Sequence, residues 1–368
     1  MDRAIAVTCH TFLTGHGIRP VREQLMALAE SPYAEPAQDT YGAGGAVALL
    51  EERMRALTGR AAARFVTKGM IAQMAALRVW TMRTGRQTVA VHRLSHLDYD
   101  EEGAVEALHP IRFQRVGDAA LPFTVEDLQA LGELPGAVSV ELPLRRAGYR
   151  LTPYADLEAI ADWCWANKVP LHIDGARAYG AAVAYGRPLS EIAAMGSSIY
   201  LSFYKELGGL AGCVLAGDED FLAECAPWIS RQAGAIYREF PLAIAALDGL
   251  DAHLGRLGEY AERARAIAAA INLVDGAYTG PEVPHTGGFQ IFLEVDADRA
   301  DPALEALTRE TGIWISPGFY RSNREGHCCF DVEIGAASAA LEPEAWADHI
   351  GKLIERARRA APQQTSIG

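Results

Sequence analysis

The chain has 368 residues, of which 50% are hydrophobic and 22% are charged, a balance typical of a globular protein with room for two or three domains. Lysine and arginine number 34 against 47 aspartate and glutamate residues, so the formal net charge is −13. This acidic balance argues against nucleic acid and against anionic membrane surfaces as partners, because clustered basic side chains bind both.

No segment approaches the roughly 18 consecutive apolar residues that a membrane-spanning helix needs. The N-terminus has no apolar run followed by a small-residue cleavage pattern, which a secretory signal would show. The six cysteines are scattered along a long chain, unlike those of a small disulfide-bonded secreted domain. We therefore expect reduced thiols and a cytoplasmic protein.

Short runs rich in β-branched, aliphatic and aromatic residues alternate with helical patterns through the first 250 residues. Alternation of this kind predicts an α/β fold with a mainly parallel sheet that helices cover on both faces. The expected strands are Ala63–Val66, Thr88–Val91, Ile111–Val116, Ala137–Glu141, Val169–Ile173, Ser198–Phe203 and Leu210–Ala216.

The clearest helix is Pro153–Asn167, with Thr152 expected as its N-cap and Pro153 as its first helical residue. Its apolar residues recur every three or four positions and form one stripe that would face the sheet. The strand that follows places Asp174 at its carboxyl end.

Beyond about residue 250 the pattern changes to one long helix, near 254–273, followed by a strand at Gly287–Val295. A further helix and strand lead to Ile315, and a terminal helix starts at Glu342. We expect residues 1–250 to form an N-terminal arm and a large sheet domain, and residues 251–368 a smaller α+β domain.

Two of the predicted strand ends carry reactive side chains, and ligands of open α/β sheets bind beyond the carboxyl ends of the strands. Asp174 follows one strand, and Lys205 follows the next, just before a glycine-rich turn. A lysine amine in this position can form a Schiff base, and a neighbouring carboxylate can keep a pyridine nitrogen protonated. The pair indicates a pyridoxal 5′-phosphate (PLP) site, whereas either residue alone fits a surface lysine or a turn-capping aspartate.

The sequence around these two residues resembles the threonine aldolase / β-eliminating lyase family of fold-type-I PLP enzymes. The matching segments are LHIDGARAYGAAVAYG, which starts at Leu171, and SSIYLSFYKELGGLAGCVLAGDEDFL, which ends at Leu222. The resemblance implies a large domain of the aspartate aminotransferase type, with Lys205 bonded to PLP and Asp174 paired with its pyridine nitrogen. It also implies that Arg177 binds the substrate carboxylate; a local ion pair with Asp174 is the alternative.

Other segments match the family pattern less strongly. By the resemblance His96 covers the cofactor ring, and Tyr41 in Asp-Thr-Tyr-Gly lies near the substrate. Arg231 and Arg238 correspond to residues that hold the phosphate across a subunit interface, so a homodimer or homotetramer is expected. Without the family, both arginines would be interpreted as surface residues.

The segment Thr67–Met70 joins a strand to a helix, where backbone N–H groups can bind a phosphate. It departs from the family's hydroxyl-Gly-Thr motif, because Lys68 and Met70 stand at the hydroxyl positions around Gly69. We expect the backbone donors to remain, with Lys68 adding charge and Ser202 a hydroxyl.

Two further departures concern the substrate. Leu144 stands where the family has a histidine that meets the substrate hydroxyl, and the N-terminal motif is replaced by one that contains His10, which either enters the substrate site or lies in an arm. A second carboxylate-binding arginine is expected at Arg324, with Arg321 as the alternative. No metal site is expected.

The resemblance implies a PLP-dependent carbon–carbon lyase acting on a small amino acid. Its expected reaction is aldol cleavage of a β-hydroxy, threonine-like amino acid to glycine and an aldehyde through a Schiff base at Lys205. The loss of the histidine at Leu144 keeps PLP-dependent β-elimination, or another reaction at Cα, as the alternative. A protein of this fold that binds without turnover is a third hypothesis.

Overall fold

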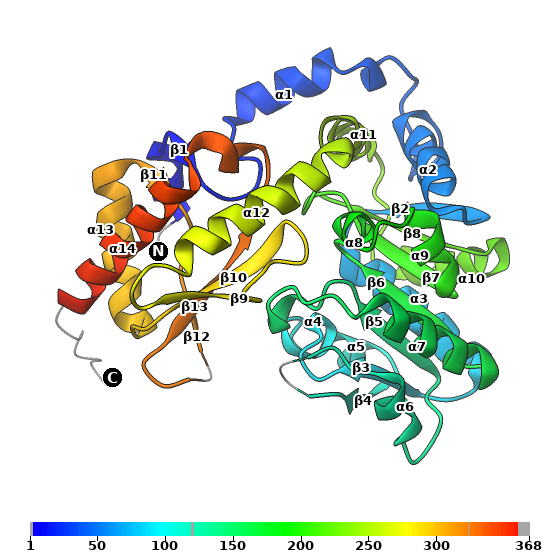
Figure 1. The fold of residues 1–368 in the computed structure, drawn as a ribbon. Helices are drawn as coiled ribbons and strands as arrows, with labels where there is room; N and C mark the ends of the chain where they lie inside the picture. The colour runs from blue at the N-terminus through cyan, green and yellow to red at the C-terminus, as the bar shows by residue number, and fades with distance from the viewer. Residues whose placement is uncertain (1–2, 119–120, 323, 360–368) are drawn as a thin grey trace, which may run out of the picture. The chain divides into compact units, whose positions relative to one another are not determined.

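The computed structural model describes residues 3–118, 121–322 and 324–359, and the chain forms two compact units (Figure 1). One unit spans Val21–Arg256, and the other joins the residues up to Pro20 to the segment that starts at Leu257. The sequence placed the N-terminal residues with the large domain instead. They belong to the second unit because β1 (Thr11–Phe12) pairs in parallel with β11 (Ile313–Trp314), 302 positions away in the chain.

The first unit contains a seven-stranded sheet in the order β2-β8-β7-β6-β5-β3-β4. The five strands β7, β6, β5, β3 and β4 run parallel to one another, and β8 is antiparallel to both β7 and β2. The expected α/β class with a mainly parallel sheet is confirmed. The strands are β2 (Ala62–Val66), β3 (Thr88–His92), β4 (Arg112–Val116), β5 (Ala137–Glu141), β6 (Leu171–Gly175), β7 (Ser198–Ser202) and β8 (Cys213–Gly217).

Most strand ends agree closely with the sequence expectation, and the largest difference is at β8. The sequence places its start at Leu210, but the strand begins at Cys213. Gly212 has a φ of 90°, which lies outside the β region and separates the preceding turn from the strand.

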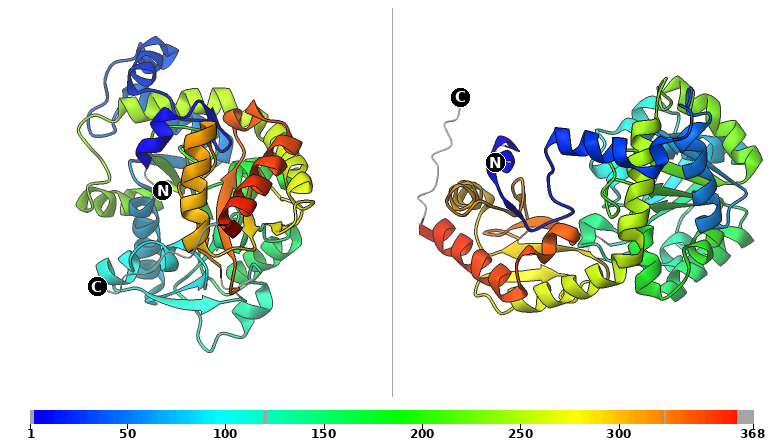
Figure 2. Two further views of the ribbon diagram at one scale, coloured as in Figure 1. Left: turned by 90° about the vertical axis from the view of Figure 1, so that its left-hand side faces the viewer. Right: turned by 90° about the horizontal axis from the view of Figure 1, so that it is seen from above.

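Helices cover both faces of this sheet (Figure 2). The central one, α3, packs against several strands and against its neighbour α10, and Trp80 and Phe221 stack with ring centroids 4.3 Å apart. Because α3 is enclosed in this way, its sequence is apolar nearly all round. The helices of this unit are α1 (Val21–Glu30), α2 (Gly45–Thr58), α3 (Gly69–Thr84), α4 (His96–Tyr99), α5 (Ala104–Leu108), α6 (Val125–Gln129), α7 (Tyr154–Ala166), α8 (Ala178–Tyr185), α9 (Leu189–Met195), α10 (Glu219–Arg231) and α11 (Phe240–His253), with 3₁₀ turns η2 (Pro32–Ala34), η3 (Arg145–Ala147) and η4 (Leu254–Arg256).

Helix α7 begins one residue later than the sequence predicts. Pro153 is the N-cap, with a ψ of 141° that is extended and not helical, so Thr152 lies outside the helix. The apolar stripe of the helix, which includes Leu157, Ile160 and Cys164, is buried as expected.

The second unit is built on a four-stranded antiparallel sheet in the order β12-β13-β10-β9. Its helices α12 and α13 both pack against α14, and contacts from α12 and α13 reach the sheet. The elements are η1 (Arg3–Thr8), α12 (Leu257–Ile271), β9 (Ala277–Gly280), β10 (Gly288–Leu293), α13 (Ala297–Thr311), β12 (Tyr320–Arg321), β13 (Cys328–Glu333), η5 (Ala336–Ala340) and α14 (Pro343–Arg359). In the part of the chain that the structure describes, no helix combines the length and apolar character needed to cross a bilayer.

Candidate active site

Asp174 and Lys205 lie at the same edge of the seven-stranded sheet. Asp174 is on β6, in register with Glu141 of β5 and Tyr200 of β7. Lys205 is three residues beyond the end of β7. Burial works to raise the pKa of Asp174, but the positive charges of His96 and Lys205 outweigh it and hold that pKa below its usual range. The structure therefore brings the two predicted groups close enough to interact electrostatically.

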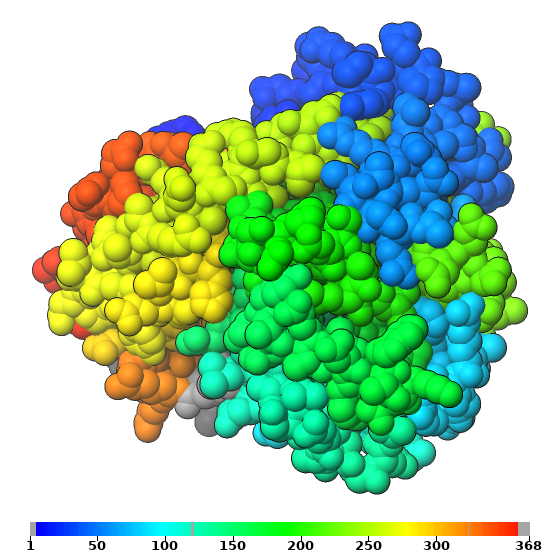
Figure 3. Space-filling view, turned by 45° about the vertical axis from the view of Figure 1, so that its right-hand side comes forward, coloured from blue at the N-terminus to red at the C-terminus, as the bar shows by residue number. Residues whose placement is uncertain are grey.

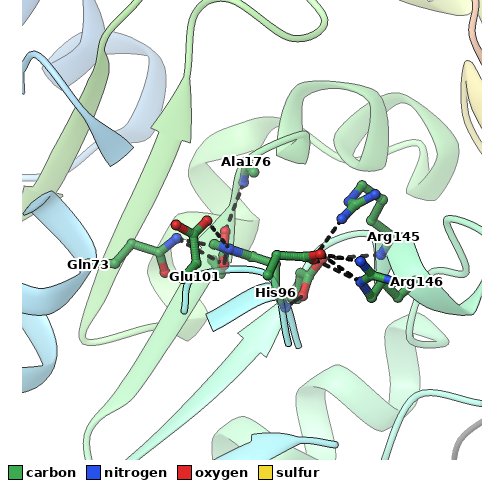
Figure 4. Close-up of polar contacts among 9 residues, drawn as sticks. Gln73, His96, Glu101, Arg145, Arg146 and Ala176 are labelled. Carbon is green, nitrogen blue, oxygen red and sulfur yellow. Dashed lines mark hydrogen bonds and ion pairs between the residues drawn. The ribbon is translucent and has the colours of Figure 1, made fainter. Parts of the chain in front are cut away.

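Three N–H donors converge on the fully buried carboxylate of Asp174 (Figure 4). The Nε2 atom of His96 lies 2.6 Å from Oδ2, and Nε2 of Gln73 donates to the same oxygen at 3.0 Å. The backbone N–H of Ala176 donates to Oδ1 at 3.3 Å. These contacts fix both carboxylate oxygens.

His96 is held between two carboxylates, because Nδ1 lies 3.2 Å from Oε1 of Glu101 while Nε2 faces Asp174. Burial alone would lower the pKa of His96, yet the attraction of Asp174 and the hydrogen bonds to both carboxylates raise that pKa to about 10. At neutral pH the ring is therefore an imidazolium paired with an ionised Asp174.

The segment that carries His96 is attached at one end to the last residue of β5 and at the other to the loop that follows this strand. Glu141 accepts the backbone N–H of His96 at 3.1 Å and that of Arg145 at 3.2 Å. At the other end Asp100 pairs with Arg145 at 2.7 Å and also with Arg146. Figure 4 shows these contacts beside the imidazole ring.

The N-terminus of α3 has the character of an anion site. Its N-cap is Lys68, an exposed residue whose side chain makes no capping bond in the described structure. The first N–H groups of a helix have no acceptor within it, so those of Gly69 and Met70 are suited to an anion. Gly69 is required here because a Cβ would lie 2.3 Å from the hydroxyl of Tyr200.

Ser202 and Met70, the other two residues predicted to bind the phosphate, differ in the polar groups that they provide. The hydroxyl of Ser202 is buried and has no hydrogen-bond partner among the described residues. The side chain of Met70 belongs to the hydrophobic core, so only its backbone N–H is polar.

Arg177 follows β6 and is only 8% exposed. Its guanidinium lies over the ring of Tyr149, 4.9 Å from the ring centroid, which orients the group. The amine of Lys205 lies 5.8 Å from the ring centroid of Tyr204, whose side chain is 44% exposed.

The structure joins the segment of Tyr41 to that of Arg238, although Asp39 and Arg238 are 199 positions apart in the chain. Arg238 donates to the carbonyl of Asp39 at 2.6 Å and to Oγ1 of Thr40 at 2.9 Å. The exposed ring of Tyr41 meets Tyr237 edge-on, with centroids 5.4 Å apart.

The remaining predicted residues lie elsewhere. Arg231 is exposed and stacks on Trp228, with its guanidinium 4.7 Å from the ring centroid. His10 and Arg324 both belong to the second unit, where Nδ1 of His10 lies 3.0 Å from Oγ1 of Thr11 and Arg324 is exposed.

Sequence reasoning missed Gln73, Glu101 and the structural part that Glu141 plays. A signal existed for Gln73, which is the only polar side chain in the run GMIAQMAAL at the start of α3. A polar residue inside an otherwise apolar helix is expected to have a specific buried partner. The sequence does not say which one.

Leu144 is 2% exposed, and its backbone N–H donates to the carbonyl of Arg150 at 2.9 Å. Its side chain has no group that can accept or donate a proton. The structure therefore supplies no titratable side chain at this position.

Comparison with known proteins points to the same family as the motif around Asp174 and Lys205. Residues 25–288 match the model of the beta-eliminating lyase family. The chain is 25% identical over 312 residues to a probable low-specificity L-threonine aldolase 2 from Arabidopsis thaliana, covering 81% of this chain and 86% of the relative.

Two solved structures share the fold over nearly the whole chain. One is a candidate aromatic amino acid beta-eliminating lyase/threonine aldolase from Exiguobacterium sp. 255-15, 31% identical, with a TM-score of 0.88 over 96% of this chain and 99% of that one. The other, a candidate L-allo-threonine aldolase from Listeria monocytogenes, is also 31% identical, with a TM-score of 0.88 over 96% and 98%. The match to the family model over most of the chain establishes that this protein belongs to the threonine aldolase / β-eliminating lyase family.

Proposed function

We propose that this protein is a PLP-dependent carbon–carbon lyase that cleaves a β-hydroxy amino acid to glycine and an aldehyde. The observation that carries the proposal is the position of Asp174 and Lys205 at one edge of the sheet, in a chain of the threonine aldolase family.

The described residues fit PLP at each of its three functional groups. A carboxylate has about four acceptor positions, and three donors reach that of Asp174, which leaves one for a pyridinium N–H. The unpartnered hydroxyl of Ser202 and the N-terminus of α3 suit its phosphate, and the amine of Lys205 suits its aldehyde. When bound, PLP supplies an electron sink for the bond that breaks at Cα.

We assign the substrate carboxylate to Arg177. A guanidinium binds a carboxylate through two parallel hydrogen bonds, and the stack on Tyr149 limits the orientations that this one can take. Arg324, Tyr41 and His10 remain our candidates for the rest of the substrate site. Binding by Arg177 would orient the amino acid so that one bond at Cα is aligned for cleavage.

Aldol cleavage also needs a group that takes the proton of the β-hydroxyl. Leu144 cannot do this, and His96 is an imidazolium with both nitrogens facing carboxylates, so it is a poor base in this state. A water molecule held by the site would have to accept the proton.

The same observation favours a second candidate function. In β-elimination the hydroxyl leaves with a proton instead of losing one, so the reaction needs no base at the position of Leu144. PLP-dependent β-elimination from a β-hydroxy amino acid is therefore the alternative.

Product analysis separates the two reactions. The PLP-loaded protein is incubated with threonine, allo-threonine, phenylserine and serine, and the products are identified. Glycine and an aldehyde support aldol cleavage, whereas ammonia and a 2-oxo acid support elimination. Lys205→Ala should abolish either reaction, and Lys352→Ala, which changes an exposed lysine paired with Asp348, should not.

We propose in addition that the enzyme is a cytoplasmic homodimer or homotetramer in which Arg231 and Arg238 reach the phosphate of a neighbouring subunit. Figure 3 shows α1 at the surface of the molecule, in blue. None of its described residues is buried, and Leu25 is 61% exposed, so the helix has apolar side chains for a partner to cover. All six cysteines are free thiols, which suits a reducing compartment. Sedimentation velocity of the purified protein tests the assembly, and a monomer would contradict it.

A further inference from the structure

Helix α3 is anchored to the sheet by two polar side chains. Gln73 donates to Oδ2 of Asp174 at 3.0 Å, and Nε1 of Trp80 donates to Oγ of Ser198 at 2.8 Å. The two residues are seven positions apart, which places them on the same side of the helix, two turns from each other. Their partners lie on the neighbouring strands β6 and β7, so the two bonds fix how far α3 can slide along the sheet.

The carboxylate of Asp174 favours one of the two orientations of the Gln73 amide, the one that places Nε2 against Oδ2. Gln73 is 0% exposed, and Oε1 has no hydrogen-bond partner among the described residues. Turning the amide over would place Oε1, in place of the Nε2 donor, against Oδ2 of Asp174, now 3.0 Å away, although Oε1 could then accept the N–H of His96, whose Nε2 lies 3.1 Å away. Leaving Oε1 of Gln73 without a partner costs free energy, and the hydrogen bond from Nε2 to the charged carboxylate of Asp174 offsets that cost.

The donor that Gln73 supplies differs from the one that His96 supplies. His96 has to cover the cofactor ring under the proposed function, and its donor strength changes with its charge. The amide of Gln73 is neutral at every pH and is fixed by the packing of α3. It also lies one helical turn beyond Gly69, so a single rigid helix carries both the phosphate-binding N–H groups and the donor to Asp174.

We propose that Gln73 is a positioning residue that holds Oδ2 of Asp174 so that the carboxylate remains directed at the pyridine nitrogen of bound PLP. This inference rests on the proposed function. Under this proposal α3 keeps the phosphate-binding N–H groups at its N-terminus at a constant distance from Asp174.

Two substitutions test the assignment through the affinity for PLP, measured by titration of the apoprotein. Gln73→Leu keeps the approximate volume and removes the donor, and we expect the dissociation constant to rise about tenfold, the effect of one hydrogen bond to a charged group. Thr81→Val is the matched control, because Thr81 is a buried residue of the same helix whose hydroxyl bonds only within α3. It should leave the dissociation constant within twofold of wild type.

Gln73→Glu gives a readout that a purely structural role would not produce. An ionised glutamate would repel Asp174, whereas a protonated one can donate to it as glutamine does. The ratio of its dissociation constant to that of wild type should therefore fall as the pH is lowered from 8 to 5. For Gln73→Leu the same ratio should stay constant.

The outcomes separate this inference from the proposed function. If wild type binds PLP but Gln73→Leu binds it equally well, the inference is overturned and the proposed function stands. A wild-type protein that does not bind PLP overturns both. Should Gln73→Leu fail to fold, the pH dependence of Gln73→Glu decides alone, and a constant ratio overturns the inference.

Discussion

The Nε2 atom of His96 lies 2.6 Å from Oδ2 of Asp174, and the Asp174 side chain is 0% exposed. A charge-assisted hydrogen bond at this distance, away from water, is stronger than an exposed ion pair. The bond ties the residue predicted to cover the cofactor ring to the residue predicted to hold its nitrogen. Several measurable properties depend on this pair.

The first prediction is that His96 stays protonated far above its ordinary range. Its pKa is raised to about 10, so its imidazole NMR signals in the apoprotein should not change between pH 6 and pH 8.5. In Asp174→Asn the attraction is lost while burial remains, and burial disfavours the charged ring. The pKa of His96 in that variant should fall well below that of wild type, although the hydrogen bond to Glu101 and the charge of Glu141 remain. A wild-type His96 that titrates near 6.5 would contradict the ion pair.

The sign of the linked stability follows from the same shift. The pKa of His96 is raised on folding, so its contribution to stability is fully present below pH 6.5 and is lost as the pH rises from there towards 10. We expect the midpoint of urea unfolding of wild type to fall between pH 7.5 and pH 9.5 more steeply than that of His96→Gln. Parallel curves for the two proteins would exclude this contribution.

A second prediction concerns the close approach of α3 to β7. Gly69→Ala would place a methyl group 2.3 Å from the hydroxyl of Tyr200 and should destabilise the protein by about 1–3 kcal/mol. It should also weaken PLP binding, because the helix N-terminus has to move. Gly132→Ala is the control, since a Cβ there meets nothing within 4 Å. In the double variant with Tyr200→Phe, part of the lost stability should return.

A third prediction concerns Glu141, which accepts the backbone N–H groups of His96 and Arg145. Glu141→Ala leaves both donors without this acceptor and should cost about 2 kcal/mol in the free energy of unfolding. Glu52→Ala, which removes an exposed partner of Arg55, should change that free energy by less than about 0.5 kcal/mol. Equal effects of the two substitutions would show that Glu141 does not secure the His96 segment.

A fourth prediction concerns Glu239, which is buried beside Asp39. Burial raises the pKa of Glu239, and the charges of Asp39 and Glu51 add to that effect, whereas the N–H of Ile236 and the charge of Arg64 oppose it; the result is a pKa of about 7. The folded protein therefore binds an extra proton between pH 4.5 and 7, and its stability falls as the pH rises through that window.

Glu239→Gln removes this dependence because glutamine does not ionise. Relative to wild type, the variant should become more stable by about 2 kcal/mol between pH 5 and pH 8, as measured by urea unfolding at both values. A stability difference that is the same at pH 5 and pH 8 would show that Glu239 titrates in its ordinary range.

The strands of the large sheet could be predicted from sequence because each is a short buried run whose apolar residues are continuous. The orientation of β8 could not, since a buried strand reads the same in either direction. The sequence also could not show that the N-terminal residues belong to the second unit. The pairing of Thr11 with Ile313 joins segments 302 positions apart, and neither two-residue strand has a pattern of its own.

The candidate site was predictable where a residue type and its place at a strand end coincide, as for Asp174 and Lys205. Gln73 was not, because its importance comes from the residue that α3 places opposite it. The two hydrogen bonds that Glu141 accepts were missed for the same reason, since their donors are backbone N–H groups that carry no sequence signal. Contacts of this kind become visible only when the packing of the helices on the sheet is known.

The most direct test of the central claim is to find which lysine holds the cofactor. The chain has only four lysines: Lys68, Lys168, Lys205 and Lys352. Wild type is loaded with PLP, reduced with borohydride, digested and analysed by mass spectrometry. We predict that the cofactor is recovered on the peptide that contains Lys205 and on none of the other three. Recovery on another lysine, or no reducible adduct at all, would contradict the account.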